Sequence, residues 1–244
     1  GSERTSSPRR TCFANASAVV RQLAPDEPLF LFSASALAAR ARSFLDGFPG
    51  ETAYAVKANP AAHVLEGLVG AGLRTYDVAS VDEIVRVRAA LPRAVIHYHN
   101  PVKSRAEILM AAIGHGVRRF AADCPEEIEK IASCLAGHVA TGEIEIAVRF
   151  RLTASGEAVH DFTSKFGASA GEASRLLADV VARGFQPVLT FHPGSQCTEP
   201  AAWRRHIVAA SEIARAAGVT LVRLNVGGGF PDRYAGLEAP GLAA

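Results

Sequence analysis

The chain has 244 residues, of which 49% are hydrophobic, so it is long enough to form one barrel-sized domain with a substantial core. Its 26 basic and 24 acidic residues nearly balance and form no block of like charge, which argues against a nucleic-acid or membrane-binding surface and favours a small-molecule ligand. The four cysteines are far apart, without a Cys-x-x-Cys pair, and no run of about 18 apolar residues occurs. We therefore expect a cytoplasmic protein without a disulfide framework, a zinc knot or a membrane span.

The first part of the chain predicts one strand and one helix after a polar leader. Residues 1–27 form a polar N-terminal segment without the apolar centre of a signal peptide. The apolar run Pro28–Phe32 predicts a short buried strand. Ser33 or Ser35 is a suitable N-cap for the following helix, which is rich in alanine and arginine. Residues 28–48 are therefore expected to form this strand and helix.

Seven further apolar runs follow, each ending in a polar residue and followed by an amphipathic segment. The strands that they predict are Thr52–Val56, Leu73–Val78, Ala94–Tyr98, Arg118–Ala122, Glu143–Phe150, Pro187–Phe191 and Thr220–Val226. Between them, Ser80 to Glu83 form the pattern of a capping box, and Pro125 is typical of the first turn of a helix. This alternation predicts parallel strands joined by crossover helices.

An open doubly wound sheet and a (β/α) barrel both fit this alternation. Polar residues or glycines follow nearly every expected strand: Lys57, Asp77, Asn100, Asp123, Arg149 or Arg151, His192 and Gly227–Gly229. A barrel collects all such residues around one mouth, whereas an open sheet brings together only those near its switch point. We therefore predict an α/β fold of the TIM type over residues 49–244, with about seven of the eight strands.

Two stretches suit the binding of a phosphorylated aldehyde. Lys57 ends the apolar run that begins at Thr52, and such a lysine either extends its ammonium group to solvent or is desolvated enough to form a Schiff base with a carbonyl group. Gly227-Gly228-Gly229 directly follow the last strand. Three glycines allow backbone N–H groups to converge on a phosphate, although they also suit a flexible turn.

A third stretch, His192 to Gln196, places a histidine beside a Gly-Ser turn. His192 is either a packed core residue or a partner for a flat ligand, with Ser195 and free backbone donors beside it. The Gly-x-Ser-x-Gly pattern of hydrolases is absent. The remaining histidines show no spacing typical of metal ligands, and we expect no metal and mostly surface or packing roles for His63, His97, His99, His115, His138, His160 and His206.

Taken together, these motifs resemble the alanine-racemase-fold (type III) decarboxylases that use pyridoxal phosphate (PLP), which include ornithine, arginine and diaminopimelate decarboxylases. The stretches that carry the resemblance are Tyr54–Asn59, Asp77–Ser80, Ser164–Gly167, His192–Gln196 and Gly227–Pro231. They occur in the same order and spacing from about residue 28 to 233. The stretch Gly-Gly-Gly-Phe-Pro is most similar to the ornithine branch.

The resemblance implies a role for each candidate residue. Lys57 would hold PLP as a Schiff base and His192 would stack on the pyridine ring, which makes these two the expected catalytic residues. The other expected cofactor-binding residues are Asp77, Arg149, Ser195, Gly227, Gly228 and Gly229. The reaction implied is decarboxylation of a basic amino acid, as in polyamine biosynthesis, by a homodimer with shared sites.

The sequence also departs from the family pattern. The resemblance implies an eighth strand and a C-terminal β-domain beyond Ala244, and the strand at 28–32 would belong to that second domain. Pro193 stands where a branched aliphatic residue is usual, and Asn225 stands where aspartate is usual. Two alternatives therefore stay open: a non-catalytic regulatory or PLP-binding relative, and an amino-acid racemase of the same fold.

Overall fold

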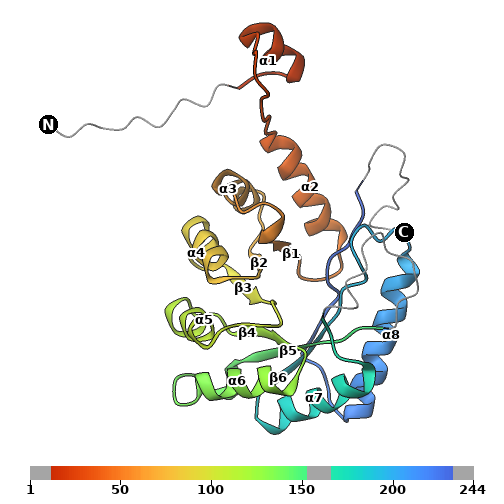
Figure 1. Ribbon diagram of the computed structural model, residues 1–244. Helices are drawn as coiled ribbons and strands as arrows, with labels where there is room; N and C mark the ends of the chain where they lie inside the picture. Colours follow the sequence, from red (N-terminus) through yellow and green to blue (C-terminus); the bar gives the residue numbers. More distant parts are fainter. Residues whose placement is uncertain (1–11, 153–165, 233–244) are drawn as a thin grey trace, which may run out of the picture.

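One parallel sheet dominates the computed structural model, which describes residues 12–152 and 166–232. The sheet has seven strands in the order of the sequence and curls into an incomplete barrel (Figure 1). The strands are β1 (Ala53–Ala55), β2 (Thr75–Val78), β3 (Val95–Tyr98), β4 (Arg119–Ala122), β5 (Glu145–Arg149), β6 (Gln186–Thr190) and β7 (Arg223–Asn225). This confirms the predicted seven-stranded barrel, with β1 and β7 as its two edges.

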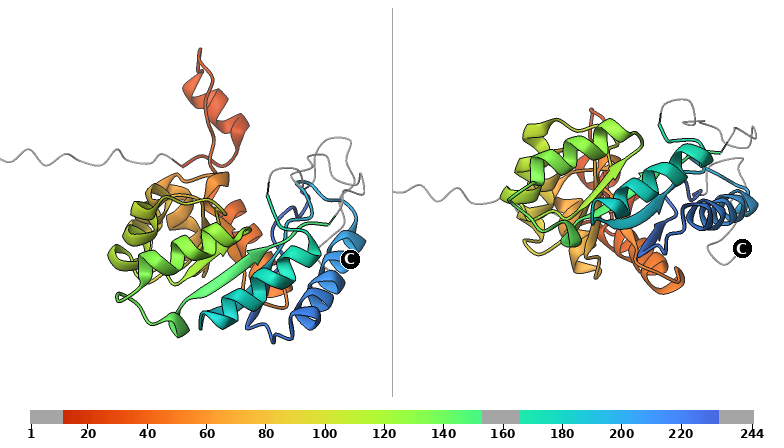
Figure 2. Two further views of the ribbon diagram at one scale, coloured as in Figure 1. Left: turned by 60° about the horizontal axis from the view of Figure 1, so that its bottom comes forward. Right: turned by 90° about the horizontal axis from the view of Figure 1, so that it is seen from below.

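Helices cover the outer face of the sheet, while the first helix stands apart from it (Figures 1 and 2). The helices are α1 (Ala16–Leu23), α2 (Ala34–Gly47), α3 (Ala62–Gly70), α4 (Val81–Ala90), α5 (Arg105–Leu109), α6 (Pro125–Leu135), α7 (Ala170–Ala182) and α8 (Pro200–Ala217). Shorter helical turns are η1 (Val56–Ala58), η2 (Met110–Gly114) and η3 (Thr141–Glu143). Among the described helices, none combines the length and the apolar character needed to cross a bilayer.

The helices begin where the sequence places their caps. The Ser33 side chain accepts a hydrogen bond at the start of α2, and Pro125 is the first residue of α6, as predicted. At the start of α4 the Ser80 hydroxyl accepts the N–H of Glu83, which is the first half of a capping box. The Glu83 carboxylate accepts the N–H of Ala79 at 2.7 Å, one residue before the position expected in that motif.

The main apolar core lies between the sheet and its outer helices, and the inside of the barrel is different. A separate small cluster there consists of Ala121, Ala147 and Val188, which lie opposite one another in the register of β4, β5 and β6. Such short side chains do not fill the inside of a barrel. Space for a ligand therefore remains above them.

The base of the barrel is closed by a ring of four charged side chains. Arg119 contacts Glu51 at 3.5 Å and Glu145 at 3.1 Å, and Arg223 contacts the same two carboxylates. Glu51 precedes edge strand β1 and Arg223 lies on edge strand β7. The ring therefore connects the two edges that no backbone hydrogen bond joins in the described sheet.

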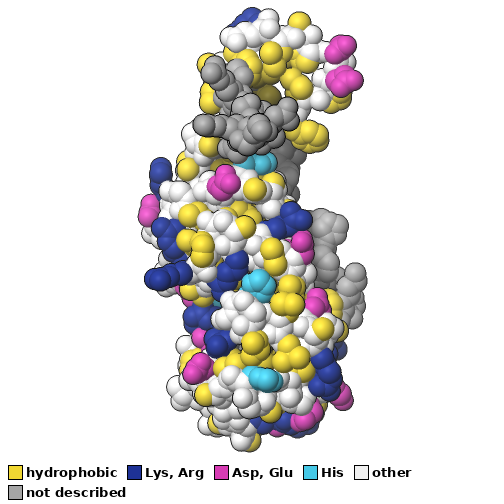
Figure 3. Space-filling model, turned by 90° about the vertical axis from the view of Figure 1, so that its left-hand side faces the viewer, with side chains coloured by type: hydrophobic (Ala, Val, Ile, Leu, Met, Phe, Trp, Pro, Cys, Tyr) yellow, Lys and Arg dark blue, Asp and Glu magenta, His cyan; other side chains and the backbone are white. Residues whose placement is uncertain are grey.

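Basic, acidic and hydrophobic side chains are interspersed on the outer face formed by α3, α4 and α5 (Figure 3). One pair on α4 joins Arg86 to Asp82 at 2.7 Å, one helical turn apart. No strong field of one sign covers the face that is shown, which agrees with the net charge of +2.

The strand predicted at 28–32 is wrong. These residues lie in the extended connection between α1 and α2, and Phe30 is fully exposed. A strand needs a neighbour to pair its N–H and C=O groups, and within the described ranges none lies beside this segment. The other predicted strands are confirmed. Six of them are shorter than expected, as in the run Thr220–Val226, which pairs only from Arg223 to Asn225, and β6 has the expected length but begins one residue earlier.

Candidate active site

A cavity of about 690 Å³ extends from the carboxyl ends of the strands down to Glu51 and Arg223 at the base of the barrel. Six of the predicted site residues line it: Lys57, Asp77, Arg149, His192, Gly227 and Gly228. Ser195 and Gly229 are not among its lining residues and lie in the two turns behind it. The barrel thus brings together residues that are up to 171 positions apart, as its topology requires.

Lys57 lies in η1, directly after β1. Its side chain is exposed, which corresponds to the first of the two alternatives, an ammonium group that extends to solvent. The reason is that the barrel is open between β1 and β7, which gives solvent access to the cavity. Asp77, an expected cofactor-binding residue, contacts Nδ1 of His99 at 3.1 Å.

His192 is half-buried, and its ring is held by the backbone of its own turn. The N–H of Gly194 donates to His192 Nδ1 at 3.1 Å, so the ring carries its hydrogen on Nε2 when it is neutral. Burial, and then the positive charges of Arg149 and Lys57, lower the pKa of His192 to about 4. The ring is therefore neutral at pH 7, and its face can lie against an aromatic ligand.

The triple glycine packs directly onto the His192 turn. Gly227 has a φ of +69°, and a Cβ atom there would lie 2.2 Å from the carbonyl oxygen of Phe191. Gly229 has a φ of +84°, and its Cβ would lie 2.0 Å from the carbonyl oxygen of Gly194. A side chain at either position would push the two turns apart, so glycine is required at both.

Contrary to the expectation, the backbone N–H groups of the triple glycine do not all remain available to a ligand. The N–H of Gly227 is taken by Oδ1 of Asn225 at 2.8 Å, so it is not available to a phosphate. The N–H groups of Gly228 and Gly229 have no acceptor within residues 12–152 and 166–232. Two unpaired N–H groups in one glycine turn form a concave site that suits an anion.

Arg149 extends into the cavity from the end of β5, with its guanidinium 5.5 Å from the centre of the Phe166 ring. Burial lowers the pKa of Arg149, and the carboxylates of Asp123 and Asp77 oppose this shift. Asp123 also accepts the N–H of Gly167 at 2.9 Å. The earlier part of the expected Ser164–Gly167 motif, Ser164 and Lys165, and also His160, lie outside the described residues.

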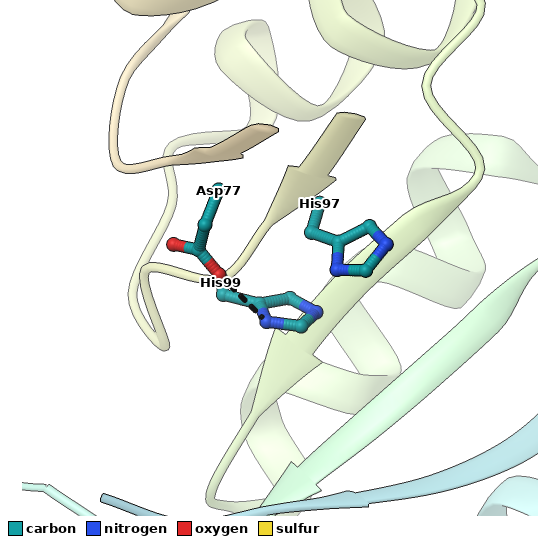
Figure 4. Close-up of side chains that lie close together, drawn as sticks. All are labelled: Asp77, His97 and His99. Atoms are coloured by element: carbon teal, nitrogen blue, oxygen red, sulfur yellow. Dashed lines mark ion pairs between the residues drawn. The ribbon is translucent and has the colours of Figure 1, made fainter. Parts of the chain in front are cut away.

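Two functional candidates, His97 and His99, were missed by the sequence analysis, which assigned them surface or packing roles. Both line the cavity, and together with Asp77 each places one potential ligand atom within 4.8 Å of the others (Figure 4). The sequence contained one signal, the spacing of the two histidines, because residues two apart on a strand share one face. The structure adds that Asp77 lies opposite His97 in the register of β2 and β3.

This cluster has the spacing of a metal site, but its donor atoms do not suit one. The Nη1 atom of Arg119 lies 2.6 Å from Nε2 of His97, and a guanidinium can only donate, so it occupies the lone pair of that nitrogen. In a neutral imidazole the other nitrogen, Nδ1, then carries the hydrogen. His97 therefore offers no free lone pair to a metal ion.

Comparison with known proteins agrees with this geometry. The family model described as "Pyridoxal-dependent decarboxylase, pyridoxal binding domain" matches residues 34–241. The chain belongs to this family. Its matched region contains every candidate residue from Lys57 to Gly229.

Individual pyridoxal-dependent decarboxylase relatives are longer than this chain. A lysine/ornithine decarboxylase of Selenomonas ruminantium is 37% identical over 183 residues, which are 73% of this chain and 44% of that protein. The antizyme inhibitor 2 of Rattus norvegicus is 31% identical over 184 residues, 73% of this chain and 38% of that protein. A crystal structure of an SrLDC mutant in complex with PLP matches with a TM-score of 0.80 and 30% identity, covering 95% of this chain and 60% of that one. The chain thus spans less than half the length of these two curated relatives.

Proposed function

We propose that this chain binds PLP through Lys57 and forms the cofactor-binding barrel of a decarboxylase that acts on a basic amino acid. The observation that carries the proposal is the single cavity lined by Lys57, His192 and the glycine turn. The residues fit the cofactor. The N–H groups of Gly228 and Gly229, which have no acceptor in the described part of the chain, suit its phosphate, and the neutral ring of His192 suits its flat pyridine.

Each side chain would have a distinct task. The amine of Lys57 would form the covalent bond to the aldehyde, and it can reach a ligand because it is exposed in the cavity. His192 would hold one face of the ring, and Arg149 would add positive charge beside the bound anion. When bound, PLP supplies an electron sink for the bond that the substrate carboxylate leaves.

The proposal is tested by trapping the covalent bond. The chain mixed with PLP is expected to turn yellow, and borohydride is expected to fix the cofactor on the peptide that contains Lys57, as read by mass spectrometry. The Lys57→Ala variant is the control and should take up no cofactor by this route. A colourless protein, or label spread over other lysines in both proteins, would contradict the proposal.

The substrate is tested separately, by release of carbon dioxide from lysine, ornithine and arginine. The relative named lysine/ornithine decarboxylase supports the first two. We propose decarboxylation for the protein of full family length, as a homodimer in the cytoplasm. Cofactor trapping without turnover by the 244-residue chain would leave binding intact and assign the reaction to the complete assembly.

The relative named antizyme inhibitor 2 favours a second candidate, a regulatory relative without catalysis. The two candidates differ at Lys57, since a purely regulatory protein does not need a lysine that bonds PLP. Failure of trapping together with a folded chain would favour the regulatory candidate. The division into a polar segment at 1–27, a segment at 28–48 whose first residues belong to a second domain, and a PLP-binding barrel at 49–244 stays a prediction.

A further inference from the structure

Gln196 has an unfavourable backbone conformation that the proposed function does not yet explain. Its φ is +54°, and in the described ranges the only other non-glycine residue with a positive φ is Ala24. Ala24 ends α1, where a left-handed residue is common. Gln196 lies between β6 and α8 and ends neither of them. A left-handed conformation is unfavourable for a residue with a Cβ atom, so it persists only where neighbouring contacts hold it.

Two hydrogen bonds join this part of the chain to the glycine turn and the residues after it. The N–H of Cys197 donates to the carbonyl oxygen of Gly229 at 2.9 Å. At Oε1, the side chain of Gln196 accepts the N–H of Asp232 at 3.3 Å. Because a backbone N–H can only donate, the second bond also fixes which end of the Gln196 amide faces Asp232. The turn that begins at His192 is thus fastened to the chain at Gly229 and again three residues later.

The two fastened turns carry the groups proposed to bind the phosphate of PLP. Ser195 directly precedes Gln196, and its hydroxyl has no hydrogen-bond partner in the part of the chain that the structure describes. Gly228 and Gly229 provide the backbone N–H groups on the other turn. Donors on two separate turns can bind one phosphate only if the turns keep a fixed separation. The bonds beside Gln196 lie where they can maintain that separation.

We propose that Gln196 is a positioning residue of the phosphate site. Its left-handed backbone and its bond to Asp232 hold Ser195 and the glycine turn at the separation that a phosphate requires. Gln196 does not line the cavity, so it acts through these neighbours rather than by touching the cofactor. The inference rests on the proposed function and deepens it. The effect of Gln196 should be confined to the phosphate, because Lys57 would bond the aldehyde and His192 would hold the ring.

The experiment compares PLP with pyridoxal, which has the same ring and aldehyde but no phosphate. Absorbance titration of the 244-residue protein gives the affinity for each. Gln196→Met keeps the length of the side chain and the left-handed strain but removes the acceptor. It is expected to weaken PLP binding about three- to tenfold and to leave pyridoxal binding unchanged. Thr198→Ala, at an exposed position two residues away, is the control and should change neither affinity.

A second variant, Gln196→Gly, separates the acceptor from the backbone strain. It removes the same acceptor, but glycine adopts a positive φ without steric cost. Its unfolding equilibrium constant in urea should therefore be about twofold or more below that of Gln196→Met. It should nevertheless lose PLP affinity while pyridoxal binding is unchanged, so it carries the test even if Gln196→Met does not fold. Wild-type affinity for PLP in Gln196→Gly, or an equal loss for PLP and pyridoxal, would overturn the proposal.

The failure of the proposed function has a different signature. In that case the wild-type protein binds neither PLP nor pyridoxal, and inorganic phosphate, followed by phosphorus-31 NMR, then tests Gln196 by itself. The wild type is expected to bind inorganic phosphate, and Gln196→Met and Gln196→Gly are expected to bind it about three- to tenfold more weakly. Equal binding by the wild type and the variants, or no binding by the wild type, would overturn the role of Gln196 as well.

Discussion

His192 makes the stability of the fold sensitive to acid. Its pKa is lowered from 6.5 to about 4, so between these values the unfolded chain binds a proton at residue 192 that the folded chain does not. Stability therefore falls as the pH decreases through this interval, by up to about 1.4 kcal/mol per pH unit from this residue. His192→Asn, which keeps an acceptor for Gly194, should remove this part of the slope in urea denaturation. His138→Asn, at an exposed position, should leave the slope unchanged.

Substitution by alanine is expected to have different effects at Gly227, Gly228 and Gly229. Gly227→Ala and Gly229→Ala should each destabilise the fold by about 1–3 kcal/mol or more, because the new methyl group meets a backbone carbonyl and φ is positive. Gly228→Ala should fold normally, since its Cβ would have its nearest contact at 3.6 Å, with Nε2 of His192. Its methyl group would instead stand in the cavity and weaken the binding of PLP. Thermal melting and PLP titration separate the two effects, and equal melting temperatures in all three variants would contradict this explanation.

Among individual residues, the sequence predicts those whose type alone indicates a function. Lys57, His192 and the glycine turn follow predicted strands, and the structure brings them to one cavity. His97 and Arg119 could not be assigned in the same way. Their roles depend on which atoms meet across neighbouring strands, and that register is set by packing rather than by local pattern.

At the scale of elements, a buried lysine holds a loop, a strand and a helix together. Nζ of Lys103 donates to the carbonyl oxygens of Asn100, after β3, and Ala121, on β4, and contacts Glu127 of α6 at 3.0 Å. Burial lowers the pKa of Lys103, and the Glu127 carboxylate opposes that shift. The ammonium group thus has two backbone acceptors and one ion-pair partner.

Lys103→Met should cost about 1–3 kcal/mol, because two carbonyl groups lose their buried donor, while the carboxylate of Glu127 keeps Lys130 as a partner. Adding Glu127→Leu to this variant should recover part of the loss. A double-mutant cycle by urea denaturation measures the coupling. Additive losses from the two substitutions would show that the pair contributes no coupling energy.

Strand and helix positions were largely predictable, because apolar runs and caps are local signals. Ser33, Ser80 and Pro125 start helices where the sequence predicts them. Residues 28–32 are the exception, because they do not form the predicted strand. The run Leu29–Phe32 has the composition of a strand, but composition does not show whether a second strand is present to pair with it.

For the molecule as a whole, Glu51 links the two open edges of the barrel. Burial raises the pKa of Glu51, but the hydroxyl of Thr75 and the charges of Arg119 and Arg223 outweigh it, and the pKa lies below 4.5. The ion pairs of Glu51 therefore contribute their full stabilisation above the pKa that Glu51 has in the unfolded chain. This stabilisation is lost as the pH falls through the lower pKa of Glu51 in the folded chain.

Glu51→Gln should increase hydrogen exchange in β1 and β7 together at neutral pH, with a loss of about 1 kcal/mol because the side chain is partly exposed. Glu145→Gln is the matched control: it removes contacts with the same two arginines but leaves the bridge between the edges. Mass spectrometry of peptides from both strands measures the effect. Equal exchange in the two variants would mean that the ring does not connect the edges.

The aromatic side chain after the triple glycine has an optical consequence. Phe230 stacks on Trp203 with ring centres 5.1 Å apart, and its ring also meets Phe44 of α2 and Phe48, the residue that follows α2. Trp203 is the single tryptophan of the chain, so its emission reports on one place, the junction of α8 with the glycine turn. A molecule that occupies this turn, or a shift of α2, would change the fluorescence directly. The protein thus carries an intrinsic probe with which its cavity can be titrated without a label.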